Sequence, residues 1–127
     1  MTKKLLAILL CLFICSNAFS QVEDVAYKYK ITGSNDCAIE FGKIQLAKTI
    51  NKKFRFRIDV NNKAGYEGYV GGYATFVSDT KAVYKSKECS SITFLFKPGN
   101  ILQIIEKNCN NNHGANICFD GNYIKYQ

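Results

Sequence analysis

The sequence predicts an all-β protein: a small antiparallel meander of seven to eight strands that closes into a barrel or a tight sandwich, linked by two disulfides. The first observation behind this prediction is that apolar and polar residues alternate with a period of two along most of the chain. The second is that no segment of ten or more residues has the periodicity of an amphipathic helix. The third is an even number of cysteines after the N-terminal segment, which is typical of disulfide-linked exported domains.

The N-terminal segment has the order of a secretory signal peptide. Two lysines precede the uncharged run Leu5–Ile14, and small residues lie just before Gln21. The run is too short to span about 30 Å of hydrocarbon. We therefore expect residues 1–20 to be a signal peptide, residues 21–127 to form a single β-domain, and the protein to be secreted or periplasmic without a membrane span.

Composition narrows the possible functions. The chain has 127 residues, 47% of them hydrophobic and 21% charged, as in ordinary globular proteins. It carries 17 basic and 10 acidic residues; without the two lysines of the signal peptide the balance is 15 against 10, or +5. The single histidine excludes chemistry that needs two histidines, including multi-histidine zinc sites.

The alternation of apolar and polar residues predicts the strands and the buried core. In Lys53–Val60, the clearest strand, Phe54 and Phe56 face one side while Arg55 and Arg57 face the other. The other expected strands are Ala26–Thr32, Ala38–Leu46, Tyr66–Val77, Lys81–Tyr84, Ser91–Phe96, Ile101–Glu106 and Asn122–Tyr126. The residues expected to be buried together are Phe54, Phe56, Ile58, Phe94, Phe96, Leu102 and Ile104, with Arg55, Arg57 and Lys107 exposed.

The residues Pro98-Gly99-Asn100 predict a three-residue hairpin loop with Asn100 in the left-handed region. In that register Phe96 faces Leu102, Phe94 faces Ile104, and Cys89 faces Cys109. Opposed strand residues have Cβ atoms about 4.5–5.5 Å apart, close to disulfide reach.

We therefore pair Cys89 with Cys109 and, by elimination, Cys37 with Cys118. Four cysteines allow three connectivities, and Cys109–Cys118 with Cys37–Cys89 stays open as the alternative. The CxxC spacing typical of zinc sites is absent, so we expect no metal and no cofactor.

A glycine- and tyrosine-rich segment, GYEGYVGGYATF, begins at Gly65. A phosphate-binding loop would need a following Lys-Ser/Thr and a helix, and neither is present. We expect the glycines to allow a sharp bend or a bulge in a strand. Alternation places Tyr69 and Tyr73 on one face, where they are candidate binding residues, and Tyr66 on the opposite face unless a bulge resets the phase.

The single histidine, His113, lies in an Asn/Gly-rich segment between two cysteines and is a third candidate binding residue. We expect it to lack a catalytic partner, because no nucleophile motif and no acidic pair at a characteristic spacing accompanies it. Asp120-Gly121 is expected to form a turn into the last strand. We therefore expect the protein not to be an enzyme.

The basic residues are scattered along the sequence, with the densest group at residues 52–57. We interpret them as solvated outer faces of strands, or as a weak attraction to acidic surfaces of the cell envelope. A nucleic-acid groove would need exposed aromatic residues among the charges, whereas Phe54 and Phe56 face inward. We expect no nucleic-acid partner.

A series of motifs runs from Gly68 to Tyr126: GYVGGYATF, TKAVY, ECSSITFLF, ILQIIEKNC and HGANICFDGNY. This half of the precursor resembles a small domain of poorly defined function in exported bacterial proteins, which sometimes accompanies lysozyme-inhibitor-like modules. The resemblance implies pairing of Cys89 with Cys109, and Cys37 and Cys118 are additions to the pattern. The cysteine-rich helical module of the named inhibitors is absent, so inhibitor activity is not carried over to particular residues.

These observations favour a secreted or periplasmic, non-enzymatic binding or inhibitor-like protein of the bacterial envelope, whose partner is an envelope protein or a cell-wall glycan. The alternatives are an immunity or structural envelope protein, or a small secreted hydrolase. Animal lysozymes are basic, so a partner of charge +5 would be repelled unless its charges lie away from the contact.

Overall fold

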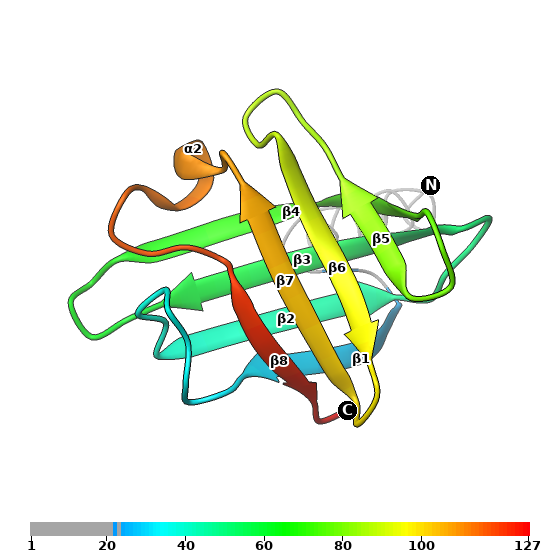
Figure 1. Cartoon of the computed structure of the whole chain (residues 1–127), viewed down its shortest axis with the longest axis horizontal. Helices are drawn as coiled ribbons and strands as arrows, with labels where there is room; N and C mark the ends of the chain where they lie inside the picture. The colour runs from blue at the N-terminus through cyan, green and yellow to red at the C-terminus, as the bar shows by residue number, and fades with distance from the viewer. Residues whose placement is uncertain (1–21, 23) are drawn as a thin grey trace, which may run out of the picture.

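Eight strands follow one another around a closed antiparallel barrel (Figure 1). The computed structural model describes Val22 and residues 24–127, so the expected signal peptide and its cleavage before Gln21 lie outside the described residues. The elements are β1 (Val25–Ile31), β2 (Phe41–Ala47), β3 (Lys53–Asn61), β4 (Glu67–Phe76), β5 (Lys81–Tyr84), β6 (Ser91–Lys97), β7 (Ile101–Lys107), α2 (Asn110–His113) and β8 (Gly121–Lys125).

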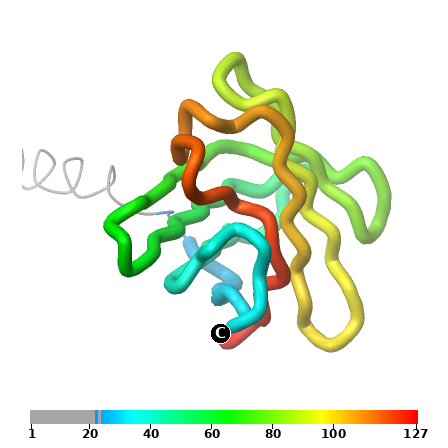
Figure 2. Tube along the Cα trace, turned by 60° about the vertical axis from the view of Figure 1, so that its left-hand side comes forward, coloured from blue at the N-terminus to red at the C-terminus, as the bar shows by residue number. Residues whose placement is uncertain are grey.

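Each strand pairs with the next one in the sequence, and β8 pairs with β1 to close the barrel (Figure 2). Strands β6 to β8 cross in front of β1 to β4, so the barrel is built as two crossing layers (Figure 1). The predicted all-β meander is confirmed, and it is a closed barrel of eight strands rather than a sandwich.

The largest difference from the expected strand bounds is at β2, which was expected to begin at Ala38 and begins at Phe41. Ala38 has a positive φ of 55°, a conformation that interrupts a strand. The Asn35 side chain then fixes a turn, because its amide bonds both the N–H and the C=O of Ile39 at 2.9 Å.

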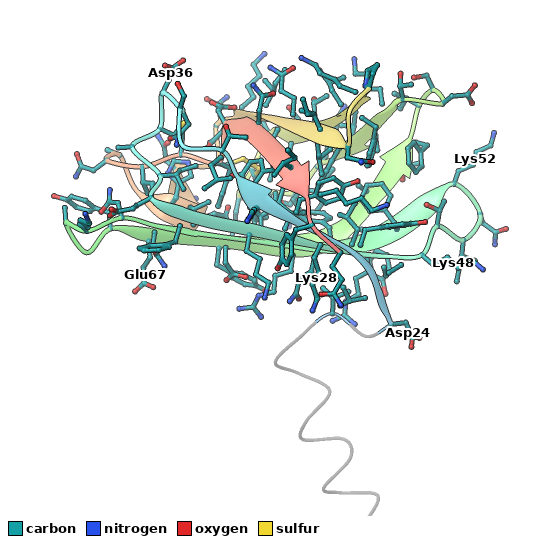
Figure 3. All side chains as sticks on the ribbon, turned by 90° about the horizontal axis from the view of Figure 1, so that it is seen from below. Asp24, Lys28, Asp36, Lys48, Lys52 and Glu67 are labelled. Atoms are coloured by element: carbon teal, nitrogen blue, oxygen red, sulfur yellow. A yellow bond between two sulfur atoms is a disulfide. The ribbon has the colours of Figure 1, made fainter. Side chains whose placement is uncertain are left out.

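The barrel interior is filled by the side chains that alternation placed inside. Phe54, Phe56 and Phe94 are each at most 2% exposed, and the Phe94 ring packs edge-on against the other two, with centroids 5.3 and 4.9 Å away. Figure 3 shows side chains packed between the two layers. Phe96 was expected to be buried, and Arg55 and Arg57 to be exposed; all three side chains are half-buried.

The β6–β7 hairpin has the expected register. Phe94 pairs with Ile104 and Phe96 with Leu102, and Asn100 has a φ of 60°. The disulfides are Cys89–Cys109 and Cys37–Cys118, so the alternative connectivity is wrong. Two disulfides indicate an oxidising, non-cytoplasmic setting for the folded chain.

The glycine-rich strand was expected to contain a sharp bend or a bulge, and its pairing with β3 contains no bulge. The β3–β4 register is unbroken from Lys53 opposite Thr75 to Asn61 opposite Glu67. The glycines instead leave room for large side chains: a Cβ atom on Gly72 would lie 2.6 Å from the Tyr84 ring. An irregularity in strand pairing occurs instead in β1, where the register with β2 shifts between Val25 and Tyr27.

Candidate functional site

Side chains fill the barrel interior, so the outer surface is the part of the barrel that is open to a partner. Alternation along β1, β2 and β3 sends every second side chain outward, and six of these side chains are basic. We call this surface the cationic face; its basic residues are Lys28, Lys30, Lys43, Lys53, Arg55 and Arg57. Figure 3 shows Lys28 on the outside of the sheet, away from the packed interior.

The strand register brings these residues together from distant parts of the sequence. One cross-strand row holds Lys30, Lys43 and Asp59, and the next holds Lys28, Gln45 and Arg57. Lys28, Lys30, Lys43 and Arg57 therefore form one patch. Arg55 and Lys53 continue it along the same face of β3.

Arg57 lies on β3, where the cationic face borders β4. Its Nε and one terminal nitrogen donate to the two Asp59 carboxylate oxygens at 2.7 and 3.1 Å, and its guanidinium lies 4.5 Å from the centre of the Tyr69 ring. The hydrogen bond that Arg57 donates to Asp59 raises the pKa of Arg57 above its ordinary value, so the guanidinium stays charged.

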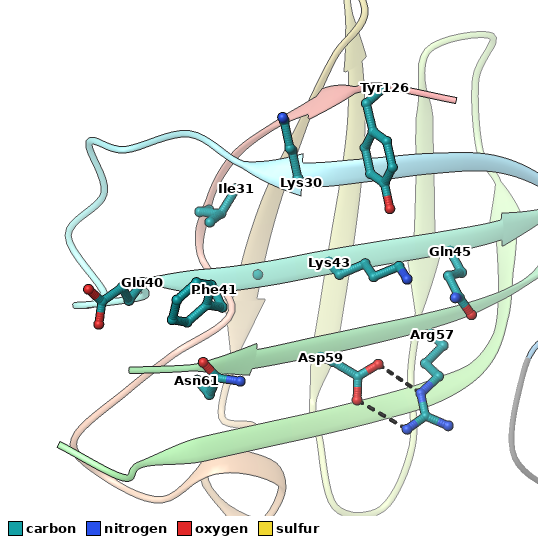
Figure 4. A pocket seen from close by; sticks show the side chains of 11 residues that line it. Lys30, Ile31, Glu40, Phe41, Lys43, Gln45, Arg57, Asp59, Asn61 and Tyr126 are labelled. Atoms are coloured by element: carbon teal, nitrogen blue, oxygen red, sulfur yellow. Dashed lines mark hydrogen bonds and ion pairs between the residues drawn. The ribbon is translucent and has the colours of Figure 1, made fainter. Parts of the chain in front are cut away.

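A groove of about 690 Å³ runs over this face (Figure 4). We call it the β1–β3 groove. Its lining combines cations, carboxylates, amides and aromatic rings: Lys30, Lys43, Arg57, Glu40, Asp59, Gln45, Asn61, Phe41 and Tyr126 are among the lining residues. The Phe41 side chain is 64% exposed and Tyr126 is 45% exposed. Large aromatic side chains this exposed are typical of binding surfaces.

A second hollow, of about 370 Å³, continues the surface across β4 and shares Arg57 with the groove. The candidate binding residues Tyr69 and Tyr73 both line it and are 50% and 65% exposed. Gly71 allows the Tyr69 ring to lie against the sheet, since a Cβ atom there would come within 2.9 Å of the Tyr69 hydroxyl. The structure thus brings two of the three candidate residues to one place.

The third candidate, His113, lies elsewhere. It is buried at the end of α2, where its Nε2 is 2.8 Å from the Glu106 carboxylate and its Nδ1 bonds the carbonyl of Gly114. His113 was expected to lack a catalytic partner on the basis of sequence spacing, and the structure places the Glu106 carboxylate beside it. Glu106 is seven residues away in the sequence, and only the turn of α2 brings the two side chains together.

Glu106 is part of a buried polar network. Its carboxylate also accepts a bond from the Phe119 N–H at 2.7 Å, and its own N–H donates to Asp120 at 2.6 Å. Burial raises the pKa of Asp120 above its ordinary value, and the nearby Glu106 charge adds to that shift. The network ties α2 and the segment before β8 to β7, so its polar groups are engaged internally.

Among the described residues, one group has ligand atoms close enough together to hold a metal: Cys37, Cys118 and Asp120. The two sulfur atoms are joined in a disulfide and are not thiolates, which zinc requires. This group therefore does not form a thiolate metal site.

The cationic face was not predicted as a site. In the sequence, Lys28 and Lys30 are two positions apart, as are Arg55 and Arg57, and this spacing places each pair on one face of its strand. Lys43 and Tyr126 join them only through the pairing of β1 with β2 and the return of the chain beside β1.

Comparison with known proteins gives no further assignment: no family model, curated protein or solved structure matches the chain. Within the part of the chain that the structure describes, no helix is long and apolar enough to cross a membrane.

Proposed function

We propose that the chain is a non-enzymatic binding protein of the bacterial envelope, secreted or periplasmic, and that it recognises its partner through the outer face of β1 to β4. The observation that carries this proposal is the joining of two hollows at Arg57, one lined by Lys30, Lys43 and Tyr126 and the other by Tyr69 and Tyr73. Exposed tyrosines beside arginine are the residue types that contribute most to binding at interfaces.

The rest of the fold supports binding at the surface. The interior holds closely packed rings, and the hydrogen-bonding atoms of the Glu106–His113–Asp120 network are engaged within the protein. The disulfides support a place outside the cytoplasm, in agreement with the expected signal peptide. A rigid barrel holds the surface side chains in fixed positions, which lowers the entropy lost on binding.

The test compares single variants of the exposed aromatic residues. Tyr69→Ala and Tyr73→Ala are assayed for binding to peptidoglycan, to lysozyme and to purified envelope glycans and proteins, with thermal unfolding as the check on folding. Ile105→Ala is the matched control, because Ile105 is 43% exposed but lies on β7, away from this face.

We expect at least one tyrosine variant to bind its partner about tenfold more weakly, the equivalent of about 1.4 kcal/mol, with unchanged unfolding. Inhibition of lysozyme by the wild-type protein would support the inhibitor-like form of the proposal. Equal binding by both tyrosine variants and the control would contradict the assigned face. Hydrolysis of a glycan or peptide substrate that is lost in His113→Gln would contradict the non-enzymatic function.

A further inference from the structure

We propose that the β1–β3 groove binds an acidic oligosaccharide, a chain of sugar rings that carry carboxylates. This inference rests on the proposed binding function and names the chemistry of the partner. It is carried by three features of the groove lining: two opposed lysines without a carboxylate partner, two exposed aromatic rings, and two side-chain amides.

The lysines carry uncompensated charge. Lys30 on β1 lies directly opposite Lys43 on β2, and like charges in opposed positions destabilise a sheet. The carboxylate beyond Lys43, Asp59, accepts hydrogen bonds from Nε and one terminal nitrogen of Arg57. Over residues 24–127 the ion pairs are Arg57–Asp59, Lys63–Glu40 and His113–Glu106, and neither lysine takes part in one. A bound anion would remove the repulsion.

The aromatic rings indicate that the ligand is more than an anion. The Phe41 and Tyr126 side chains both line the groove, Phe41 next to Glu40 and Tyr126 near Lys30, and both expose much of their surface (Figure 4). Lys30 Nζ lies 5.8 Å from the centre of the Tyr126 ring, so a cation and an aromatic surface are presented together. The C–H-rich face of a sugar ring packs on such an aromatic surface while its substituents reach neighbouring polar groups.

The amides supply hydrogen bonds for hydroxyl groups. Gln45 and Asn61 line the same groove, and each amide offers both donors and an acceptor. The side-chain oxygen of Gln45 is buried without a hydrogen-bond partner, which costs free energy. A sugar hydroxyl that donates to this oxygen, after a rotation of the amide toward the groove, would satisfy it.

The position of the groove argues against an extended acidic peptide. Such a peptide commonly adds a strand to an open sheet edge. The groove instead lies on the broad side of the sheet, and β2, at its centre, is paired with β1 on one side and β3 on the other. Its backbone groups are therefore used, and recognition depends on side chains alone. The groove volume of about 690 Å³ is in the range of sites for small ligands.

The test uses the disulfide-bonded protein and probes that separate charge from ring structure. Oligogalacturonate and oligohyaluronate supply carboxylates on sugar rings, methyl-esterified oligogalacturonate keeps the rings without the charge, and polyglutamate keeps the charge without the rings. Binding is measured by calorimetry at low and at high salt. The variants are Lys43→Gln and Tyr126→Ala, and Lys81→Gln is the control because Lys81 is exposed on β5.

We expect at least one acidic oligosaccharide to bind. Methyl esterification of oligogalacturonate and the Lys43→Gln substitution should each weaken binding about tenfold or more. Tyr126→Ala should also weaken it, Lys81→Gln should leave it unchanged, and added salt should weaken it through screening. These results together support the inference.

Three results would overturn it: no binding of either acidic oligosaccharide, equal binding of the methyl ester, or equal binding by Lys43→Gln and wild type. Tighter binding of polyglutamate that depends on Lys43 would assign the groove to an acidic protein partner instead. In each case the proposed binding function stands or fails separately, on the effect of Tyr69→Ala and Tyr73→Ala on envelope partners.

Discussion

A Cβ atom on Gly68 would lie 2.5 Å from the Cβ of His113 and 3.2 Å from its Cα. Glycine at this position of β4 therefore lets α2 pack directly on the strand. We expect Gly68→Ala to lower the free energy of unfolding by about 1–3 kcal/mol, because α2 must shift to make room. Gly33→Ala is the control, since a Cβ atom at Gly33 would meet nothing within 4 Å. Urea unfolding measures both, and equal stability of the two variants would refute the close packing.

The Glu106–His113 contact is expected to show strong coupling in a double-mutant cycle. Both side chains are at least nine-tenths buried, so removing either one leaves the other without its partner. We expect Glu106→Ala and His113→Ala each to cost about 3–5 kcal/mol. The double variant should cost less than the sum, by about 0.5–3 kcal/mol. Additive losses in denaturant unfolding would mean that the two side chains do not interact.

Asp120 should make stability depend on pH in the acid range. Burial raises the pKa of this carboxyl, so the folded protein holds the proton more tightly than the unfolded chain does. As pH rises from the unfolded pKa to the folded pKa, the free energy of unfolding therefore falls, and the loss persists above that range.

Asp120→Asn removes this titration but keeps an oxygen that can accept the bond from the Glu106 N–H. The stability of the variant relative to wild type should therefore increase from about pH 3 to about pH 7. Asp79→Asn, in an exposed turn, serves as the control. A difference between Asp120→Asn and wild type that does not change with pH would contradict the raised pKa.

The two disulfides should differ in their contribution to stability. Cys37–Cys118 joins residues 81 apart in the sequence, and Cys89–Cys109 joins residues 20 apart. Replacing either pair by serine should cost about 2–5 kcal/mol, with the longer loop costing about 1 kcal/mol more. Non-reducing peptide mapping first establishes the connectivity; a peptide linking Cys109 to Cys118 would contradict it.

The parts of the fold that were predicted correctly are those set by residues close together in the sequence. Each strand was found from its own alternation, and the Pro98–Asn100 loop fixed the β6–β7 register that sets Cys89 opposite Cys109. The second disulfide then followed by elimination. The start of β2 was misjudged because the hydrogen bonds of Asn35 to Ile39 compete with strand pairing, and alternation does not reveal such bonds.

The candidate site was less predictable because it depends on contacts between distant segments. Tyr69 and Tyr73 were predicted to share a face because they lie on one strand with an even spacing. Lys30 and Lys43 come together only through the β1–β2 register, which contains an irregularity near Val25 that no sequence pattern marks. The buried position of His113, on α2, depends on Gly68, which lies on β4 and was interpreted as a site of bending or bulging.

The order of strands has a consequence for how the barrel forms. All of its ladders except one join strands that are consecutive in the sequence; the exception pairs β1 with β8, with Ile31 opposite Tyr123. The entropy lost on closing a loop grows with its length, so this seam is the costliest ladder to form from an unfolded chain. Cys37 follows β1 and Cys118 precedes β8, so their disulfide spans the seam. Once that bond has formed, the ends of the sheet are tethered, and the last ladder closes as a local event.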